Sequence, residues 1–279
     1  MITDLNKTKF WRISQLDNLE ILHATDVLVS SPRHTHESLT FGVVDRGSAL
    51  LNCKGQLHPI REDCVIVINP DDVHACHTDT PGGYSQRMMY LSVALLEQIT
   101  YEITGRSQLL PLFKEVVLQD QKMARQAKLL FQSLTTSMFT LKQETQLLST
   151  LVALVQAHAE IPSLKHQWRN TYPLAVCQVK EYLQANYAEN PSLNQLSALT
   201  HLSPFHLSRI FSHTVGLPPH LYLIQVRVSH AKKLLAQGMA IAQVAQEVGF
   251  AHQSHLNRHF KRVMGITPKQ YQNSKNVQD

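Results

Sequence analysis

Cysteine is scarce in this sequence. The four cysteines, Cys53, Cys64, Cys76 and Cys177, are widely spaced and none belongs to a C-x-x-C pair. They are too few for a chain of 279 residues to depend on disulfides. We therefore expect reduced and mostly buried thiols that behave as small hydrophobic side chains. The alternative is a redox switch through Cys64 and Cys76.

Long apolar runs are also missing. No run of about 18 uninterrupted apolar residues occurs, which argues against a membrane span. The segment Met1–Phe10 is polar and has no apolar core of the kind that secretory signals need. We expect a cytoplasmic protein. With 43% hydrophobic residues, the chain can still bury a full core, and its length favours two domains over one.

Motifs of the common catalytic classes are absent too. The sequence has no glycine-rich phosphate loop, no dinucleotide fingerprint, no G-x-S-x-G and no evident triad. We therefore predict that the chain is not an enzyme.

Charge is unevenly distributed between the two halves. Residues 1–160 hold 14 Lys/Arg and 17 Asp/Glu, a net charge of −3, whereas residues 172–279 hold 10 and 4, a net charge of +6. This asymmetry indicates that the C-terminal part meets a polyanion while the N-terminal part has another task.

The chain changes character twice. From Leu19 to Val93, short β-rich runs alternate with turn residues such as Lys54-Gly55, which is typical of a sandwich or small barrel. Leucine-rich amphipathic segments then predict helices over 124–139 and 144–158. Residues 161–173 contain two prolines and no clear periodicity, so they are the predicted linker. We expect an N-terminal domain over 1–160 and an all-helical domain over 174–279.

An internal repeat occupies the C-terminal part. One block runs from Leu193 to Pro219 and the other from Ile241 to Pro268, with matching positions 48 residues apart before the turn and 49 after it. The second copy therefore has one extra residue in its turn. Each block has the layout of a helix-turn-helix, whose second helix presents exposed residues to the DNA major groove.

Local signals place the ends of these helices. Ser203 followed by Pro204 is typical of an N-cap and a first helical residue, and Gln253 or Ser254 opens the matching helix. Gly216 and Gly265 fall where the helices must end. Between the blocks, residues 220–237 predict one long connector helix with Arg227, Lys232 and Lys233 exposed. The alternative for the whole region is a helical bundle with duplicated hairpins.

The motifs of this region resemble the DNA-binding domain of the AraC/XylS family of transcription regulators. They are Leu196-Ser197, Leu207-Ser208-Arg209-Ile210-Phe211, Val244-Ala245, Gly249-Phe250, Leu256-Asn257-Arg258-His259-Phe260-Lys261 and Gly265-Ile266-Thr267-Pro268. The resemblance covers residues 176–271, about a third of the chain. It implies a seven-helix domain with two helix-turn-helix units that binds specific double-stranded DNA as an activator or sometimes a repressor.

By position, the resemblance assigns the DNA-contacting residues. They are Phe205, Ser208 and Arg209 in the first unit and Gln253, Ser254, His255, Asn257 and Arg258 in the second. Arginine can bond guanine through two atoms, and asparagine and glutamine can read adenine. Several family members have tryptophan where this chain has Phe205. For Ser254 and His255, phosphate contact without base reading is the alternative.

The N-terminal half resembles the cupin-type sensor domain that precedes this DNA-binding domain in many family members. The matching segments are Pro32-Arg33-His34-Thr35-His36-Glu37, Gly47 and Ile68-Asn69-Pro70-Asp71-Asp72-Val73-His74. The resemblance implies an α+β protein whose N-terminal cupin-like β-barrel holds a small-molecule effector, with flanking helices that pair two subunits into a homodimer. The pattern is also similar to that of regulators associated with amino-acid export, so an amino acid is a permissible effector.

Two interpretations remain for His34, His36 and His74. In metal-binding cupins, such histidines converge on a divalent ion, with His77 or Glu37 nearby, and imidazole suits zinc, iron or nickel. Otherwise they shape a sensor pocket without metal. Arg33, Arg46 and Arg87 are candidate anchors for a carboxylate ligand.

Two further functions compete with that of an effector-responsive regulator. One is a metal-dependent cupin enzyme fused to a DNA-binding domain, which stoichiometric metal would favour. The other is an architectural protein that binds DNA through phosphates without sequence preference. A net charge of only +6 and two base-reading helices argue against the latter.

Overall fold

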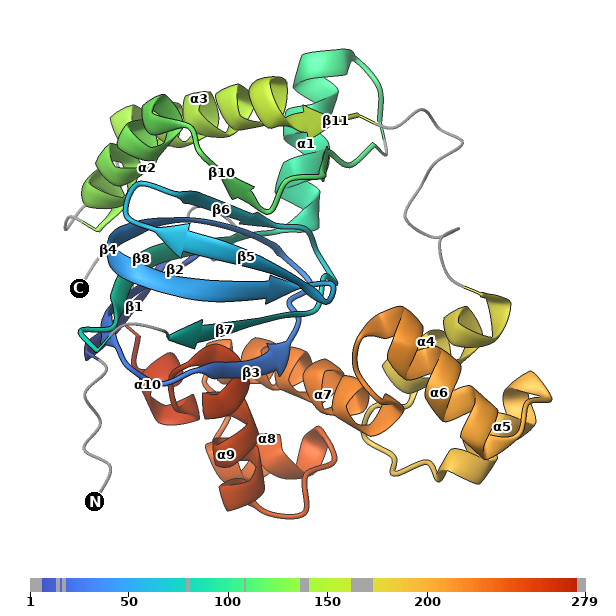
Figure 1. Cartoon of the computed structure of the whole chain (residues 1–279). Helices are drawn as coiled ribbons and strands as arrows, with labels where there is room; N and C mark the ends of the chain where they lie inside the picture. The colour runs from blue at the N-terminus through green and yellow to red at the C-terminus, as the bar shows by residue number, and fades with distance from the viewer. Residues whose placement is uncertain are drawn as a thin grey trace. The chain divides into compact units, whose positions relative to one another are not determined.

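The structure, a computed structural model, describes residues 7–13, 16, 19–78, 81–107, 109–135, 141–161 and 173–274. It divides into two compact units, one of residues 1–30, 36–167 and 274–279 and the other of residues 31–35 and 168–273. The first is β-rich and the second is built from helices (Figure 1). The predicted combination of a β-rich N-terminal domain and a helical C-terminal domain is confirmed. Most of the predicted linker, residues 162–172, lies outside the described residues.

Among the described residues, nine strands form one sheet. They are β1 (Lys7–Ile13), β2 (Leu19–Val27), β3 (Ser31–His34), β4 (Leu39–Cys53), β5 (Gln56–Arg61), β6 (Val65–Ile68), β7 (His74–Thr78), β8 (Tyr84–Leu91) and β10 (Val117–Leu118). The path runs β1-β2-β8-β4-β6-β10, while β5 and β7 pair with β4, and β3 pairs with β7. Strands β9 (Leu112–Phe113) and β11 (Ala159–Glu160) form a separate pair.

Strand β4 connects the two halves of this sheet. The sequence predicts only short β-rich runs in this region, but the chain continues here as one strand of 15 residues. Its first half pairs with β6 and β8, and its second half pairs with β5 and β7. The register to β8 shifts between Val44 and Arg46. Gly47 lies at φ +79°, and a Cβ there would lie 2.3 Å from the carbonyl oxygen of Gly83. Glycine is therefore required where the strand bends.

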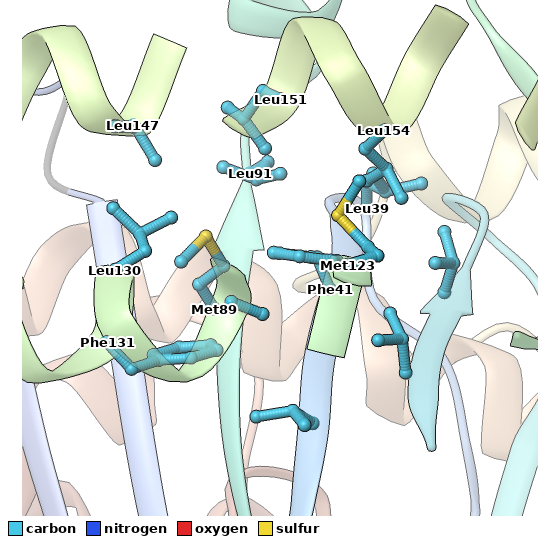
Figure 2. Close-up of a cluster of buried hydrophobic side chains, with 14 of the residues drawn as sticks. Leu39, Phe41, Met89, Leu91, Met123, Leu130, Phe131, Leu147, Leu151 and Leu154 are labelled. Carbon is cyan, nitrogen blue, oxygen red and sulfur yellow. The ribbon is translucent and has the colours of Figure 1, made fainter. Parts of the chain in front are cut away.

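Alternation along the strands gives the sheet two buried faces. On one face, Phe41 and Met89 pack against the helices α2 and α3, as Figure 2 shows. On the other, which we call the inner face, Leu22, Val44 and Ile66 belong to a second apolar cluster. Three of the cysteines, Cys53, Cys64 and Cys76, are buried, and none of the four forms a disulfide, as predicted. The two apolar clusters give each face of the sheet its own core.

Three helices follow the strands: α1 (Val93–Thr104), α2 (Gln121–Leu134) and α3 (Leu141–His158). The hydroxyl of Ser92 caps α1 and the carboxylate of Asp120 caps α2, each by accepting a hydrogen bond from a backbone N–H of the first turn. The predicted helices over 124–139 and 144–158 correspond to α2 and α3, although both begin about three residues earlier. Residues 136–140 lie outside the described residues.

Seven helices make up the described part of the C-terminal unit. They are α4 (Leu174–Ala185), α5 (Leu193–Thr200), α6 (Pro204–Val215), α7 (Pro219–Ala236), α8 (Ile241–Glu247), α9 (Gln253–Met264) and α10 (Pro268–Gln272). Ser203 caps α6 with Pro204 in its first turn, and Gly216 and Gly265 end α6 and α9 in the left-handed conformation, as predicted. Among the described helices, none is long and apolar enough to cross a membrane.

Candidate nucleic-acid interface and sensor site

Helix α6 separates its side chains into a buried and an exposed face. Leu207 and Phe211 are fully buried in the core of the first helix-turn-helix, whose first helix is α5. Arg209 is exposed, and the Phe205 side chain is 78% exposed at the first turn of α6. Because a large aromatic side chain seldom stands this far in water without a partner, the start of α6 is a candidate contact surface.

Helix α9 repeats this division in the second unit. Leu256 and Phe260 are fully buried, whereas Gln253, Ser254 and Arg258 are exposed. His255 and Asn257 are half-buried. Arg209 and Arg258 occupy the same position of the repeat, and both are exposed. The geometry therefore places most of the predicted DNA-contacting residues on accessible helix faces.

The two turns share one backbone conformation. His201, at φ +55°, and Gly249, at φ +81°, are 48 residues apart and both are left-handed. The N-cap residues Ser203 and His252 are 49 residues apart. The extra residue of the second copy is therefore Ala251. Helix α9 begins at Gln253 after the N-cap His252, whose side chain forms no cap hydrogen bond, so the alternative start at Ser254 was wrong.

The prediction of an exposed side chain for Arg227, on the connector helix α7, was wrong. The residue is only 5% exposed. Its Nε donates to the carbonyl oxygen of Tyr187 at 2.7 Å, and its Nη2 donates to the carbonyl of Glu189 at 2.7 Å and to Oδ1 of Asn190 at 2.9 Å. The guanidinium of Arg227 therefore donates hydrogen bonds to three acceptors in the loop that joins α4 to α5.

The same loop also meets the turn of the second helix-turn-helix. A Cβ on Gly249 would lie 2.4 Å from the carbonyl oxygen of Ala188. The guanidinium of Arg227 lies over the ring of Phe250 at 5.7 Å. We call these five residues, Tyr187, Ala188, Arg227, Gly249 and Phe250, the junction. It holds the two helix-turn-helix units against each other through close contacts.

Two histidines on α9 interact with each other. The Nε2 atoms of His255 and His259 lie 2.9 Å apart, and both rings contact Phe250. Burial, followed by the neighbouring His255 and Arg258, lowers the pKa of His259 to about 4. Burial also lowers the pKa of His255. Because the His255 ring already contacts His259 and Phe250, we expect it to have a limited role in reading bases.

Two of the three histidines singled out in the N-terminal half, His36 and His74, lie side by side. His34 ends β3, His36 lies in the following loop, and His74 begins β7, which pairs with β3. All three are buried, and the rings of His36 and His74 lie 5.3 Å apart. Burial lowers the pKa of His34, so its ring is held neutral. The exposed side chains of Glu37 and His77 do not belong to this group.

The loop before His74 is held by buried polar contacts. The side chain of Asn69 donates to the carbonyl of Phe113 at 2.8 Å and accepts from its N–H at 2.9 Å. Asp72 pairs with Lys54 at 2.8 Å, and burial raises the pKa of its carboxyl group. The Asp72 carbonyl faces Nδ1 of His74 at 3.0 Å. These contacts fix the position of His74.

A row of polar side chains on the inner face was missed by the sequence analysis. Tyr90 lies opposite Glu20 on one side and Thr40 on the other, so the three share a face of the sheet. Glu20 and Thr40 are buried, and the His36 ring meets Tyr90 edge-on at 4.9 Å. Burial and then the Glu20 carboxylate raise the pKa of Tyr90. The inner face therefore offers a carboxylate and two hydroxyl groups beside the histidines.

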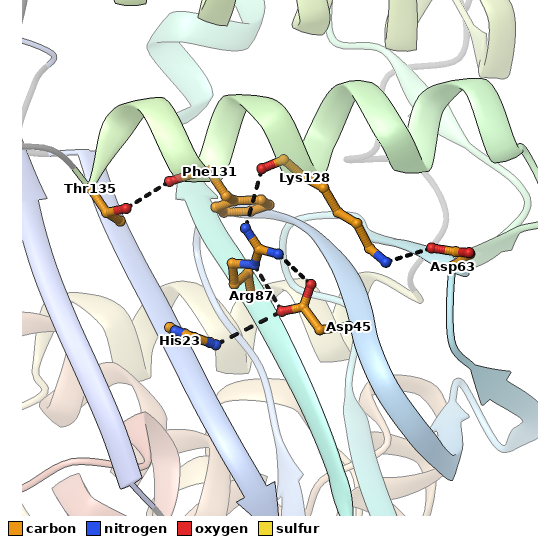
Figure 3. Close-up of polar contacts among 7 residues, drawn as sticks. All are labelled: His23, Asp45, Asp63, Arg87, Lys128, Phe131 and Thr135. Carbon is orange, nitrogen blue, oxygen red and sulfur yellow. Dashed lines mark hydrogen bonds and ion pairs between the residues drawn. The ribbon is translucent and has the colours of Figure 1, made fainter.

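Two of the candidate carboxylate anchors already have carboxylate partners. Arg46 pairs with Asp26. Arg87 forms two hydrogen bonds to Asp45, at 2.8 and 2.5 Å, and donates to the carbonyl of Lys128 on α2 (Figure 3). Arg87 therefore ties the sheet to α2, which weakens the prediction that it anchors a ligand.

Two known family models match the N-terminal and the C-terminal part of the chain separately. The family model described as AraC-like ligand binding domain matches residues 18–151, and that described as helix-turn-helix domain matches residues 196–274. The HTH-type transcriptional regulator YbfI of Bacillus subtilis is 30% identical over 254 residues, which are 90% of each chain. The probable transcriptional regulator LumQ of Photobacterium leiognathi is 28% identical over 155 residues, or 62% of its length.

Solved structures with the same fold include ToxT from Vibrio cholerae. An apo variant of ToxT has a TM-score of 0.59 at 13% identity and covers 91% of this chain and 96% of its own. Unsaturated fatty acid bound ToxT has a TM-score of 0.56 at 13% identity over 91% and 94% of the two chains. The chain therefore belongs to the AraC family of helix-turn-helix transcriptional regulators that carry a ligand-binding domain before the DNA-binding domain.

Proposed function

We propose that residues 174–279 read DNA sequence through α6 and α9. The observation that supports this is the matched pair of exposed faces on two repeated helices. The residues concerned are Phe205, Ser208 and Arg209 on α6 and Gln253, Ser254, His255, Asn257 and Arg258 on α9. Arg209 and Arg258 suit guanine, whereas Gln253 and Asn257 suit adenine.

The connector and the junction set the form of the operator. Helix α7 has 18 residues and so spans about 27 Å. Successive major grooves on one side of B-DNA lie about 34 Å apart. Because the junction holds the two units together, we propose an operator with two boxes about one helical turn apart, read by one chain. Insertion of five base pairs between the boxes should abolish binding. Insertion of about ten base pairs should restore part of the affinity only if the contacts of the junction break.

We propose that residues 1–160 bind the effector and that residues 161–173 link this domain to the DNA-binding domain. The inner face supports a small polar effector because it presents Glu20, Tyr90 and Thr40. The Glu20 carboxylate would suit the ammonium group of an amino acid. A thermal-shift screen of the twenty amino acids tests this proposal. A shift that disappears in Glu20→Gln but persists in the exposed control Glu62→Gln supports it, and no shift with any amino acid contradicts it.

We propose that the chain forms a homodimer through α2 and α3. The support is a set of exposed apolar side chains on these helices: Leu129 is 54% exposed, Leu141 78% and Leu148 38%. Leu141 and Leu148 are seven residues apart, so they share a face of α3. Sedimentation should show a dimer that Leu148→Arg converts to a monomer, while Ala157→Arg, at an exposed position of α3 that lies off this face, has a smaller effect. A monomeric parent protein would contradict this proposal.

We propose that the chain regulates transcription in the cytoplasm and does so without catalysis. This role is supported by the relatives, which are transcriptional regulators. The experiment that tests it is binding of the purified chain to DNA upstream of its own and adjacent genes, against random DNA at one salt concentration. Specific protection supports a regulator. Equal affinity for all DNA would favour the architectural alternative instead.

A further inference from the structure

We propose that His255 and His259 on α9 bind one divalent copper ion through their Nε2 atoms. This goes beyond the proposed function, because the reading of bases by α9 requires no metal. The two residues are four apart in one helix, so their side chains lie one turn apart on the same face. Their Nε2 atoms lie 2.9 Å apart, and both rings are half-buried. Two imidazole nitrogens that face each other at this distance can chelate one ion.

The spacing of the two nitrogens selects the geometry of the ion. With metal–nitrogen bonds of about 2.0–2.1 Å, nitrogens that lie 2.9 Å apart subtend an angle of about 90° at the ion. Tetrahedral zinc would require a separation of about 3.4 Å. A right angle suits the square-planar or tetragonal coordination of copper, which also binds nitrogen ligands more tightly than the other divalent ions of its row. The remaining coordination positions are then left to water.

The two rings are already held in place. The ring of Phe250 meets His255 edge-on at 5.2 Å and stacks on His259 at 5.9 Å. Phe250 is itself buried and belongs to the junction, where the guanidinium of Arg227 lies over its ring. An ion therefore meets imidazoles that are ordered before it binds, which reduces the entropy lost on binding.

Both imidazoles are neutral at pH 7, which is the form that binds metals. Burial lowers the pKa of His255, and burial followed by the neighbouring His255 and Arg258 lowers the pKa of His259 to about 4. In the metal-free pair, Nε2–H of one ring donates to Nε2 of the other. When the ion binds, the donor ring carries its proton on Nδ1 instead, so both Nε2 lone pairs face the ion.

Nearby arginines limit the affinity of the site. The charges of Arg258 and Arg262 act on His259, and those of Arg258 and Arg227 act on His255. These positive charges oppose a divalent cation. Because the pair also supplies only two protein ligands, we expect micromolar rather than nanomolar affinity for Cu²⁺.

The repeat provides a matched control in the first helix-turn-helix. Helix α6 has the exposed His206 where α9 has His255, but Ile210 where α9 has His259, and both pairs of positions are 49 residues apart. Helix α6 therefore carries one imidazole on the same scaffold without a second nitrogen one turn further on. We expect it not to chelate an ion.

Copper titration of three full-length proteins tests the site. The parent, His259→Gln and His206→Gln are stripped of metal with a chelator and titrated with Cu²⁺ in a calorimeter. At micromolar concentration, His259→Gln should bind one Cu²⁺ per chain fewer than the parent, because loss of a ligand should weaken this site by at least about 10-fold. His206→Gln should match the parent.

The difference between these variants isolates the pair from the other histidines of the chain. Equal copper binding by His259→Gln and the parent would overturn the proposal, as would an equal loss in His206→Gln. No DNA is present, so either result leaves the proposed reading of bases untouched. If His259→Gln fails to fold, as judged by circular dichroism, anomalous scattering from copper-soaked crystals of the parent decides. An ion bound to both Nε2 atoms supports the site, and no copper at α9 overturns it.

Discussion

The Nε atom of Arg227 lies 2.7 Å from the carbonyl oxygen of Tyr187 and joins the connector helix α7 to the loop after α4. The neighbouring Ala188 leaves no room for a side chain at Gly249, in the turn of the second helix-turn-helix. The ring of His230 stacks on Tyr187 at 3.7 Å. One loop therefore contacts both the connector and the second unit. The spacing of the two recognition helices follows from these contacts as well as from the length of α7.

Replacement of Arg227 by methionine should destabilise the C-terminal domain by about 2 kcal/mol, because the half-buried hydrogen bonds to the carbonyls of Tyr187 and Glu189 lose their charged donor. Chemical unfolding of the full chain measures this. Lys233→Met, on an exposed side chain of the same helix, is the matched control and should change stability by less than about 0.5 kcal/mol. Equal stability of the two variants would show that the Arg227 hydrogen bonds do not hold the junction.

Two glycines allow the free-energy cost of a left-handed backbone to be measured apart from the cost of a steric clash. Gly238 and Gly249 have φ of +84° and +81°, but a Cβ at Gly238 meets nothing within 4 Å. Gly238→Ala should therefore cost only the left-handed penalty of about 1 kcal/mol. Gly249→Ala should cost about 2 kcal/mol more, because its Cβ collides with Ala188. Unfolding curves of both variants decide, and an equal loss would contradict the close approach.

A double-mutant cycle can measure the interaction free energy of the ion pair between Arg87 and Asp45. Its side chains are only 15% and 17% exposed. Arg87→Met alone should cost about 2 kcal/mol, because the Asp45 carboxylate loses both charged hydrogen bonds from Arg87 and keeps the more distant His23 at 3.8 Å. Adding Asp45→Leu should recover part of that loss. If the two single losses simply add in the double variant, the two side chains do not stabilise each other across β4 and β8.

Stability should depend on pH through His259. Its pKa of about 4 lies below the ordinary value of 6.5, so between these values the unfolded chain binds a proton that the folded chain does not. The free energy of unfolding should fall as the pH drops from 6.5 to 4 and should not change through this group above 6.5. His259→Gln should flatten that part of the profile. An unchanged slope in the variant would assign the pH dependence to other groups.

Much of the architecture could be predicted because it follows from short-range rules. The ends of α6, for example, are set by Ser203, Pro204 and Gly216, whose effects act within one turn. The repeat made the second helix-turn-helix predictable from the first. The proximity of His36 and His74 was predicted from family resemblance alone, since no local pattern indicates which segments will meet.

What could not be predicted depends on long-range contacts. Arg227 has the sequence pattern of an exposed connector residue, and only the approach of the loop at Tyr187 buries it. The row of Glu20, Tyr90 and Thr40 comes from three strands whose register the sequence does not reveal. Asp45 and Arg87 are 42 residues apart and become partners only through β4–β8 pairing.

DNA recognition through α9 should separate base contacts from phosphate contacts. Arg258→Ala should weaken specific binding by about 1–3 kcal/mol and relax the preference at one base pair. Lys261→Ala should weaken binding to all sequences alike and reduce the salt dependence by about one ion. Competition with operators mutated at single positions measures both. A uniform loss for Arg258→Ala would show that this side chain contacts phosphate only.

The measurement that tests the central claim most directly is titration of the full-length chain against its own upstream DNA and against random DNA at fixed salt. The proposed reading of bases by α6 and α9 predicts a preference of about a thousandfold or more, lost when Arg209 and Arg258 are both replaced by alanine. Equal affinity for the two DNAs, or a preference that survives the double replacement, would contradict it.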